Sequence, residues 1–186
     1  MTEESGAGTA ERQFGGTGQH DDVHWPWPFD AVIAVGSNIG DKAGHINEAV
    51  VRFGAHADVA VVVRSPIYKT PPWGITDQAW FANGCFTVTT TLSPHGLLDW
   101  CLEVEQQLGR VRAQKWGPRI IDLDVLVCRG AAIHDARLTL PHPHLTERGF
   151  VLVPMADVAP DIIVRGKTIT QWRDRSDNQG IESLTQ

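Results

Sequence analysis

The chain has 186 residues, a formal net charge of -6 and 42% hydrophobic residues. This length suits one domain with some additional sequence, and the apolar content excludes disorder over the whole chain. The negative charge argues against binding a long nucleic acid, and no apolar run is long enough to span a bilayer. Three widely spaced cysteines exclude a disulfide framework. We therefore expect a cytoplasmic protein that binds neither membranes nor nucleic acids, and we separately expect it to be a monomer.

Composition divides the chain into three parts. Residues 1–29 are polar and show no periodicity, so we expect a disordered N-terminal extension. Trp25 and Trp27 within it are interpreted as an extended segment whose indoles lie on the domain surface, with a docking motif as the alternative. The folded domain is expected over residues 30–170, followed by a C-terminal tail over residues 171–186.

The pattern of apolar residues predicts alternating strands and helices. Strands are expected at 31–35, 59–68, 81–92 and 120–127, with a short extended segment at 138–140. Helices are expected at 42–56, 94–109 and 145–157, the last interrupted at Pro154. The consecutive prolines in Thr70–Gly74 predict a loop there. The order β-α-β, β-α-β predicts an α+β fold of the ferredoxin-like kind, with helices packed on one face of a mostly antiparallel sheet.

Two carboxylates on the fourth strand give the clearest chemical signal. Because side chains alternate along a strand, Asp122 and Asp124 share one face, with Cα atoms about 6.6 Å apart. The opposite face is expected to be apolar and to carry Ile121, Leu123, Val125 and Val127. Adjacent carboxylates raise the pKa of one of them unless a cation lies between, and such oxygen ligands suit one or two Mg²⁺ ions. A strand with a solvated polar face shows the same spacing.

A cluster of cations precedes this strand and contains no acidic residue. Its members are Arg110, Arg112, Lys115 and Arg119, with Trp116 among them. A solvated loop is the ordinary interpretation of such a run. Beside two carboxylates, the cluster instead favours a metal-bound polyphosphate, whose oxygens pair with guanidinium groups. Glu105, at the edge of the preceding helix's apolar stripe, needs a partner, and an arginine of this loop is the obvious one.

Two further groups add to this picture. His142 and Arg148 fit phosphate contacts, although a structural loop histidine is an equally good interpretation, and the absence of a nearby cysteine disfavours a zinc site at His142 and His144. Phe81 and Asn83 share a strand face. There the amide suits the edge of a flat heterocycle, with Phe81 and Trp116 stacking on its faces. The alternative is a core phenylalanine beside a satisfied polar residue.

The longest motif resembles a known family. Glu105-x-x-x-Gly109-Arg110-x-Arg112, followed by Lys115-Trp116-Gly117-Pro118-Arg119-x-x-Asp122-Leu123-Asp124-Val125-Leu126, is similar to the signature of 6-hydroxymethyl-7,8-dihydropterin pyrophosphokinases of folate biosynthesis. Gly36-Ser37-Asn38, Thr70-Pro71-Pro72-x-Gly74, Phe81-x-Asn83, Leu140-Pro141-His142 and Arg148-Gly149-Phe150 resemble its other landmarks in the same order. The resemblance covers residues 30–160.

The resemblance implies transfer of diphosphate from MgATP to a reduced pterin, with AMP as the second product. The catalytic residues would be Arg110, Arg119, Asp122 and Asp124, with two Mg²⁺ ions on the two aspartates. ATP would be bound by Glu105, Arg112, Lys115, Val125, His142 and Arg148. The pterin would be bound by Thr70, Pro71, Trp73, Phe81, Asn83, Trp116 and Phe150. Residues 71–80 and 110–119 would close over the substrates.

Two other functions stay open on the residues alone. A nucleotide- or RNA-binding module would stack its ligand on Trp116 and would need no Mg²⁺. A different Mg²⁺-dependent nucleotidyltransferase would use the same pair of aspartates but release pyrophosphate. The products formed from ATP distinguish the three hypotheses.

Overall fold

The computed structural model describes residues 27–74, 77–110 and 118–184. A six-stranded antiparallel sheet forms its centre, in the order β10-β3-β4-β1-β5, with β2 also pairing with β4. The strands of this sheet are β1 (Ala31–Ser37), β2 (Val59–Arg64), β3 (Tyr68–Thr70), β4 (Phe81–Thr90), β5 (Asp122–Cys128) and β10 (Glu182–Ser183). The predicted α+β ferredoxin-like fold is confirmed.

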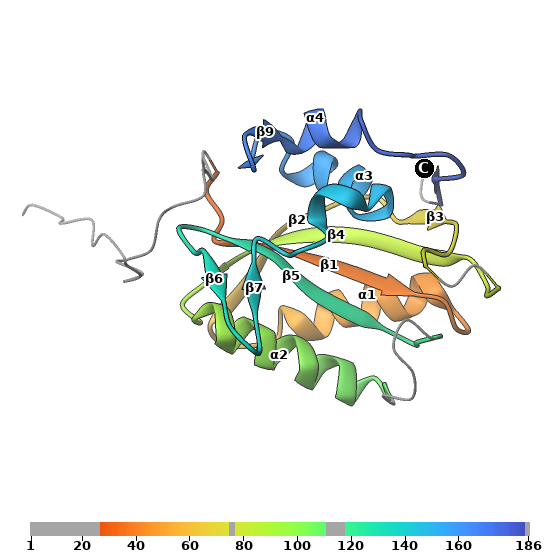
Figure 1. The fold of residues 1–186 in the computed structure, drawn as a ribbon. Helices are drawn as coiled ribbons and strands as arrows, with labels where there is room; N and C mark the ends of the chain where they lie inside the picture. Colours follow the sequence, from red (N-terminus) through yellow and green to blue (C-terminus); the bar gives the residue numbers. More distant parts are fainter. Residues whose placement is uncertain (1–26, 75–76, 111–117, 185–186) are drawn as a thin grey trace, which may run out of the picture.

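Helices cover both faces of the sheet (Figure 1). α1 (Lys42–Phe53) and α2 (Pro94–Gln107) lie on one face, as expected. α3 (Gly149–Val158) and α4 (Ile169–Arg173) cover the other face, which the sequence analysis left uncovered. The remaining elements are β6 (Ile133–His134), β7 (Thr139–Leu140), the 3₁₀ turn η1 (Leu145–Glu147), β8 (Ile163–Val164) and β9 (Lys167–Thr168).

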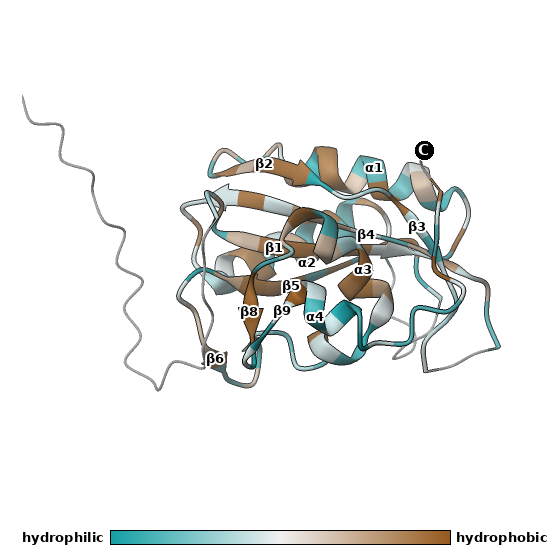
Figure 2. Ribbon diagram, turned by 90° about the horizontal axis from the view of Figure 1, so that it is seen from above, coloured by the Kyte–Doolittle hydropathy of each residue, from teal (hydrophilic) through white to brown (hydrophobic). Residues whose placement is uncertain are grey.

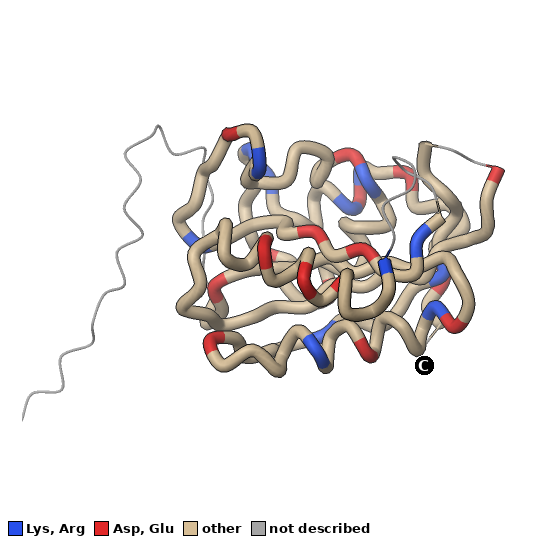
Figure 3. Tube along the Cα trace, turned by 90° about the horizontal axis from the view of Figure 1, so that it is seen from below, with Lys and Arg blue, Asp and Glu red and all other residues tan. Residues whose placement is uncertain are grey.

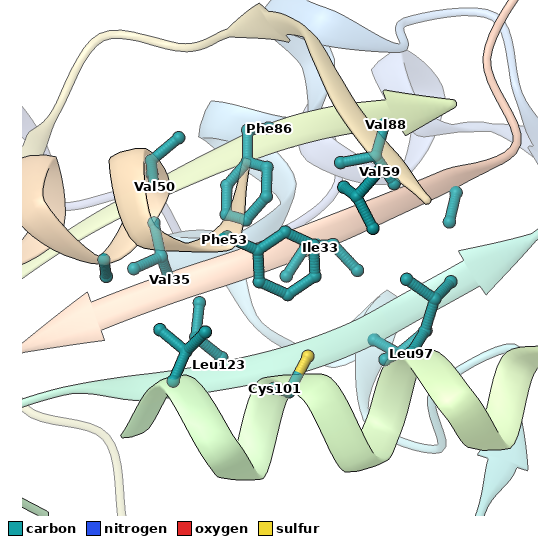
Figure 4. Close-up of a cluster of buried hydrophobic side chains, with 14 of the residues drawn as sticks. Ile33, Val35, Val50, Phe53, Val59, Phe86, Val88, Leu97, Cys101 and Leu123 are labelled. Atoms are coloured by element: carbon teal, nitrogen blue, oxygen red, sulfur yellow. The ribbon is translucent and has the colours of Figure 1, made fainter. Parts of the chain in front are cut away.

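Each face of the sheet has its own hydrophobic core. The core under α1 and α2 contains Phe53 and Phe86, whose rings meet edge to face with centroids 5.2 Å apart (Figure 4). The core under α3 and α4 contains Leu152 and Met155, both fully buried. The strands run between these two layers of helices in Figure 1, and Figure 2 shows brown, hydrophobic stretches along them. Burial on both faces explains why the strands read as nearly continuous apolar runs.

Three local expectations were wrong. The predicted strand over 59–68 is two strands, because Pro66 lacks an N–H and interrupts the ladder between β2 and β3. Thr70 is the last residue of β3 and does not belong to the following loop. Pro154 lies inside α3 without ending it, since the surrounding helix is almost entirely buried and packing outweighs one lost hydrogen bond.

A β-bulge in β5 changes the face of the sheet to which the later side chains of this strand point. The register of β1 with β5 shifts between Val32 and Ile33, so that Val32 pairs with Val127 and Ile33 with Val125. The residue between them, Leu126, is the extra one. As a result Val127 packs in the core under α3, not with Val125 as strict alternation predicts, and the two aspartates before the bulge keep their common face.

The two ends of the described chain pack onto the domain. Phe29 is buried and stacks on Trp27, while Arg129 Nη2 donates to the carbonyl oxygens of both residues at 2.6 and 2.7 Å. The boundary expected at residue 170 falls inside α4, and β10 adds a strand to the sheet beside β3. Residues 1–26, which include Trp25, lie outside the described residues.

Charged residues of both signs are distributed over the domain. Lys/Arg and Asp/Glu are interspersed in the view from below (Figure 3).

Among the described residues, no helix combines the length and the apolar character that crossing a bilayer requires.

Candidate active site

A row of four residues crosses the sheet where β5 begins. Asp122 of β5 pairs with Gly36 of β1, Gly36 with Asn83 of β4, and Asn83 with Tyr68 of β3. Directly paired residues share a sheet face, so the Asp122 carboxylate and the Asn83 amide stand on the same face. The glycine between them has no side chain. The row therefore brings together the two predicted clusters and leaves bare backbone between them.

Asp122 lies between two arginines. Its Oδ1 is 2.7 Å from Arg110 Nη1, and its Oδ2 accepts a hydrogen bond from Arg119 Nη1. Arg110 Nη1 also pairs with Glu105 Oε1. The expectation that a loop arginine partners Glu105 is thus confirmed. The carboxylates of Glu105 and Asp122 hold Arg110 between them at the end of α2.

Glu105 is a buried joint between α2 and β5. The residue is 2% exposed, and Oε1 accepts the backbone N–H of Leu123 at 2.7 Å. Burial raises the pKa of Glu105, while the Leu123 N–H and Arg110 oppose that rise. The glutamate therefore fixes the backbone between Asp122 and Asp124 as well as the guanidinium group beside them.

The pKa of Asp124 is raised, as is expected for a buried carboxylate beside a second one. Burial, and next to it the charge of Asp122, raise its pKa to about 7, while Arg148 acts in the opposite direction. Such a carboxylate is stabilised by a cation close to it. No group of three or more metal-binding side chains occurs among the described residues. The two carboxylates fit Mg²⁺, which usually takes its remaining ligands from water and substrate phosphates.

Asn38 is a site residue to which the sequence analysis assigned no role. Its Oδ1 accepts the backbone N–H of Arg119 at 2.8 Å, and its own N–H donates to the Arg119 carbonyl at 3.2 Å. Its Nδ2 donates to Gln78 Oε1 at 3.2 Å. Asn38 thus joins the segment before β5 to the loop before β4. The motif Gly36-Ser37-Asn38 was the available signal; its first two residues belong to β1, and Asn38 follows directly, but nothing in the sequence gave the partners of Asn38.

The other end of the row has a preorganised amide. Asn83 is 8% exposed, and its Nδ2 donates to Thr70 Oγ1 at 2.7 Å. A Cβ added to Gly36 would lie 2.5 Å from Asn83 Oδ1, so the amide rests directly over the glycine. Phe81 is half-buried and belongs to neither core. The predicted common face of Phe81 and Asn83 is kept.

Residues from distant parts of the chain gather around Trp73. The Arg148 guanidinium lies 4.6 Å from the Trp73 ring centroid, and the ring of Phe150 lies 6.4 Å from that of Trp73. Arg148 Nε is buried and has no hydrogen-bond partner among the residues that the structure describes. A buried donor without a partner is suited to an anionic group of a ligand, and the two aromatic rings beside it are suited to a planar group.

His142 is held close to these groups. Its backbone N–H donates to Leu126 O at 2.8 Å, which ties the segment after β7 to β5. Burial, followed by the charge of Arg148, lowers the pKa of His142 to about 4. The imidazole is therefore neutral near pH 7. A neutral imidazole can donate one hydrogen bond but carries no positive charge.

The remaining predicted residues are placed differently or not described. Val125 packs into the core under α1 and α2, so its side chain does not point toward the site. Pro71 is exposed at the start of the loop after β3. Arg112, Lys115 and Trp116 lie outside the described residues, as do parts of both expected closing loops.

Comparisons with known proteins give one consistent result. Residues 32–160 match the family model described as 7,8-dihydro-6-hydroxymethylpterin-pyrophosphokinase. A Methylorubrum extorquens protein named 2-amino-4-hydroxy-6-hydroxymethyldihydropteridine pyrophosphokinase is 51% identical over 154 residues, which are 83% of this chain and 98% of that protein. A Bacillus subtilis protein of the same name is 42% identical over 132 residues, covering 71% of this chain and 79% of that protein.

Solved structures share the fold. A crystal structure described as HPPK-DHPS in complex with substrates superposes with a TM-score of 0.64 at 14% identity, over 80% of this chain and 43% of that chain. The wild-type Plasmodium falciparum HPPK-DHPS gives a TM-score of 0.60 at 16% identity, over 79% of this chain and 43% of that chain. This chain therefore corresponds to less than half of those longer chains.

Proposed function

The chain belongs to the 7,8-dihydro-6-hydroxymethylpterin pyrophosphokinase family, and on that premise we propose which of its residues perform the reaction. The reaction transfers a pyrophosphoryl group from ATP to 6-hydroxymethyl-7,8-dihydropterin in folate biosynthesis. The hydroxymethyl oxygen forms a bond to the β-phosphorus, the bond from that phosphorus to the α,β-bridging oxygen breaks, and AMP leaves.

The observation that carries the assignment of residues is the row Asp122–Gly36–Asn83. Asp122 would lie on the triphosphate side and Asn83 on the pterin side. The bare backbone of Gly36 separates them, and there the two reacting groups can approach each other. Holding both substrates in one geometry supplies much of the catalysis in reactions of this type.

On the triphosphate side, the arginines neutralise charge. When bound, Mg²⁺ neutralises part of the negative charge of the phosphates. We propose that Asp122 and Asp124 hold two such ions. The guanidinium groups of Arg110 and Arg119, which pair with Asp122 in the structure, would then turn to phosphate oxygens. Such forked donors stabilise negative charge that develops in the transition state. Arg112, Lys115, His142 and Arg148 complete this side.

On the pterin side, side chains recognise a flat ring with an amide-like edge. The Asn83 amide, held by Thr70, would pair with that edge. Phe81, Trp116, Phe150 and Trp73 would pack against the ring faces. The polar groups are fixed before the substrate arrives, which lowers the cost of ordering them on binding.

A product assay tests the proposal. The purified chain is incubated with MgATP and 6-hydroxymethyl-7,8-dihydropterin, and the nucleotide products are separated. AMP formed in step with the pyrophosphorylated pterin supports the proposal, whereas ADP, free pyrophosphate or no product contradicts it. Asp124→Asn is expected to abolish turnover, with Asp161→Asn, an exposed carboxylate remote from the row, as the matched control. Activity of Asp124→Asn within a few-fold of the control would remove the metal role.

We also propose that the chain works as a cytoplasmic monomer, since every described residue assigned above comes from one chain and ATP is its co-substrate. Sedimentation of the active enzyme and fractionation of cells test these two points. An active species with twice the mass of the chain would contradict the first.

A further inference from the structure

A short hairpin beyond the family match carries an arginine with an unusual backbone. Strands β8 and β9 are joined by Arg165 and Gly166, which have φ angles of 48° and 74°. Two-residue hairpin loops with positive φ at both positions favour Asn-Gly or Gly-Gly, because most side chains disfavour the left-handed region. Arg165 is the one non-glycine residue with positive φ among those the structure describes. The turn alone does not explain an arginine here.

The hairpin is fastened to the core. Val164 is fully buried in the core under α3, and its carbonyl accepts the Trp172 Nε1–H at 2.8 Å. Lys167 Nζ lies 4.7 Å from the centroid of the Trp172 ring. Figure 2 shows β8 and β9 beside α4. Arg165 therefore extends from a rigid base.

The guanidinium reaches the segment between His142 and Arg148. Arg165 Nη1 donates to Thr146 Oγ1 at 3.1 Å, and Nη2 donates to the Pro143 carbonyl at 3.2 Å. The opposite side of this segment is anchored by Leu145, which is fully buried. The segment is thus held between the core and one arginine.

We propose that Arg165 is a positioning residue that holds the segment 143–147 so that His142 and Arg148 meet the triphosphate in a fixed geometry. This inference rests on the function proposed above. Arg165 acts through the loop, and both of its terminal nitrogens, Nη1 and Nη2, contact atoms of the protein. Its contribution is to reduce the freedom that the loop loses when ATP binds.

The backbone strain makes the inference testable. Asparagine tolerates the left-handed region better than arginine does. Arg165→Asn therefore relieves the turn and removes both contacts to the loop. If the arginine served the fold alone, the variant would lose stability and activity together. If it positions the loop, stability stays or rises while ATP binding weakens.

The experiment compares three full-length variants. Arg165→Asn removes the contacts to Thr146 and Pro143. Arg165→Lys keeps the charge but can make at most one of these contacts. Lys167→Ala removes one charge from the same hairpin. Each is measured for melting temperature, for KM and kcat with MgATP, and for amide hydrogen exchange of residues 143–147 without nucleotide. We expect Arg165→Asn to keep or raise the melting temperature, to raise the KM for MgATP about three- to ten-fold, and to speed exchange in 143–147. Arg165→Lys should lie between, and Lys167→Ala should keep the wild-type KM for MgATP and the wild-type exchange of 143–147, with a small fall in melting temperature because its contact to Trp172 is lost.

The outcomes separate the two hypotheses. An unchanged KM in Arg165→Asn overturns the inference, as does an equal rise in Arg165→Asn and Lys167→Ala, which would mean that charge alone matters. Parallel losses of stability and activity in Arg165→Asn also overturn it. If the wild-type chain releases no AMP, the proposed function fails. The Kd for ATP and the exchange rates then decide whether Arg165 still positions the loop.

Discussion

Asn38 and Arg119 are joined by two hydrogen bonds that fix the backbone of an arginine at the site. The Arg119 N–H donates to Asn38 Oδ1 at 2.8 Å, and the Asn38 N–H donates to the Arg119 carbonyl at 3.2 Å. Asn38 is 5% exposed, so these hydrogen bonds are shielded from water. Arg119 also pairs with Asp122. By fixing the backbone of Arg119, Asn38 therefore fixes the point from which this side chain extends to the site.

Asn38→Ala is therefore expected to damage catalysis more than it damages the fold. The substitution leaves the Arg119 N–H without its acceptor and loosens the arginine, and an unmade buried hydrogen bond costs about 1–3 kcal/mol. Expressed in the transition state, this is a fall in kcat/KM of roughly 5- to 150-fold. Steady-state kinetics with both substrates measure it.

Gln78→Ala is the matched comparison for Asn38→Ala. It removes the 3.2 Å contact to Asn38 Nδ2 but leaves both bonds to Arg119 in place. Its effect on kcat/KM should be clearly smaller. Equal losses in the two variants would mean that the contact to the loop before β4, and not the hold on Arg119, is what catalysis needs.

Gly36→Ala should disturb the pterin side. The added methyl group would lie 2.5 Å from Asn83 Oδ1, a separation at which the amide must move. Its bond to Thr70 Oγ1 would then break, and overpacking of this kind costs about 1–3 kcal/mol of stability. We expect the KM for the pterin to rise and the free energy of unfolding in urea to fall.

A double-mutant cycle tests the cause of that loss. In a chain that already carries Asn83→Ala, the clash is absent, so Gly36→Ala should cost much less stability. Additive losses would show that the glycine is needed for another reason, such as the backbone of β1 itself.

The sequence predicted the parts of the site that follow from local periodicity. Alternation placed Asp122 and Asp124 on one face, and the helical stripe identified Glu105 as a polar residue in need of an arginine. It could not predict that Gly36 lies between Asp122 and Asn83, because register across three strands depends on pairings between residues far apart in the sequence. The bulge at Leu126, which turns Val127 to the other core, has the same origin.

A helix was expected at 145–157, but its place on the second face of the sheet was not predicted. α3 is apolar on every side, and such a segment shows no periodic stripe that would indicate which face it covers. β8, β9 and β10 are two residues long, and no pattern can be read from so few positions. Arg165 and Asn38 act through contacts that only the folded chain forms, so their residue types alone gave no indication of a role.

Glu105→Ala should destabilise the fold strongly. The substitution leaves the Leu123 N–H without an acceptor and removes one partner of Arg110 inside the structure. A buried N–H left without an acceptor costs about 1–3 kcal/mol, and the cavity left by the removed side chain adds to that cost. Urea unfolding measures the loss.

Glu105→Gln serves as the comparison for Glu105→Ala. The amide oxygen can still accept the Leu123 N–H, and burial no longer opposes a charge, since burial is the main cause of the raised pKa of Glu105. This variant should retain most of the stability. If both variants lose the same amount, the ion pair with Arg110, and not the bond to Leu123, stabilises the joint between α2 and β5.

The lowered pKa of His142 predicts how stability depends on pH. Burial and Arg148 lower this pKa to about 4, whereas an unfolded histidine titrates near 6.5. Between these values the unfolded chain binds a proton that the folded chain does not. The contribution of His142 is therefore complete above pH 6.5 and is lost as the pH falls toward 4, with a slope of up to about 1.4 kcal/mol per pH unit.

Urea unfolding of the metal-free chain from pH 7 to pH 4 tests this, with His142→Gln expected to show a flatter profile than the wild type. His134→Gln, an exposed histidine on β6, is the control and should keep the wild-type slope. In NMR titrations the His142 ring should change with a midpoint near pH 4. MgATP should move that midpoint upward, because a neighbouring phosphate favours the imidazolium form. A midpoint that stays the same with MgATP would place His142 away from the phosphates.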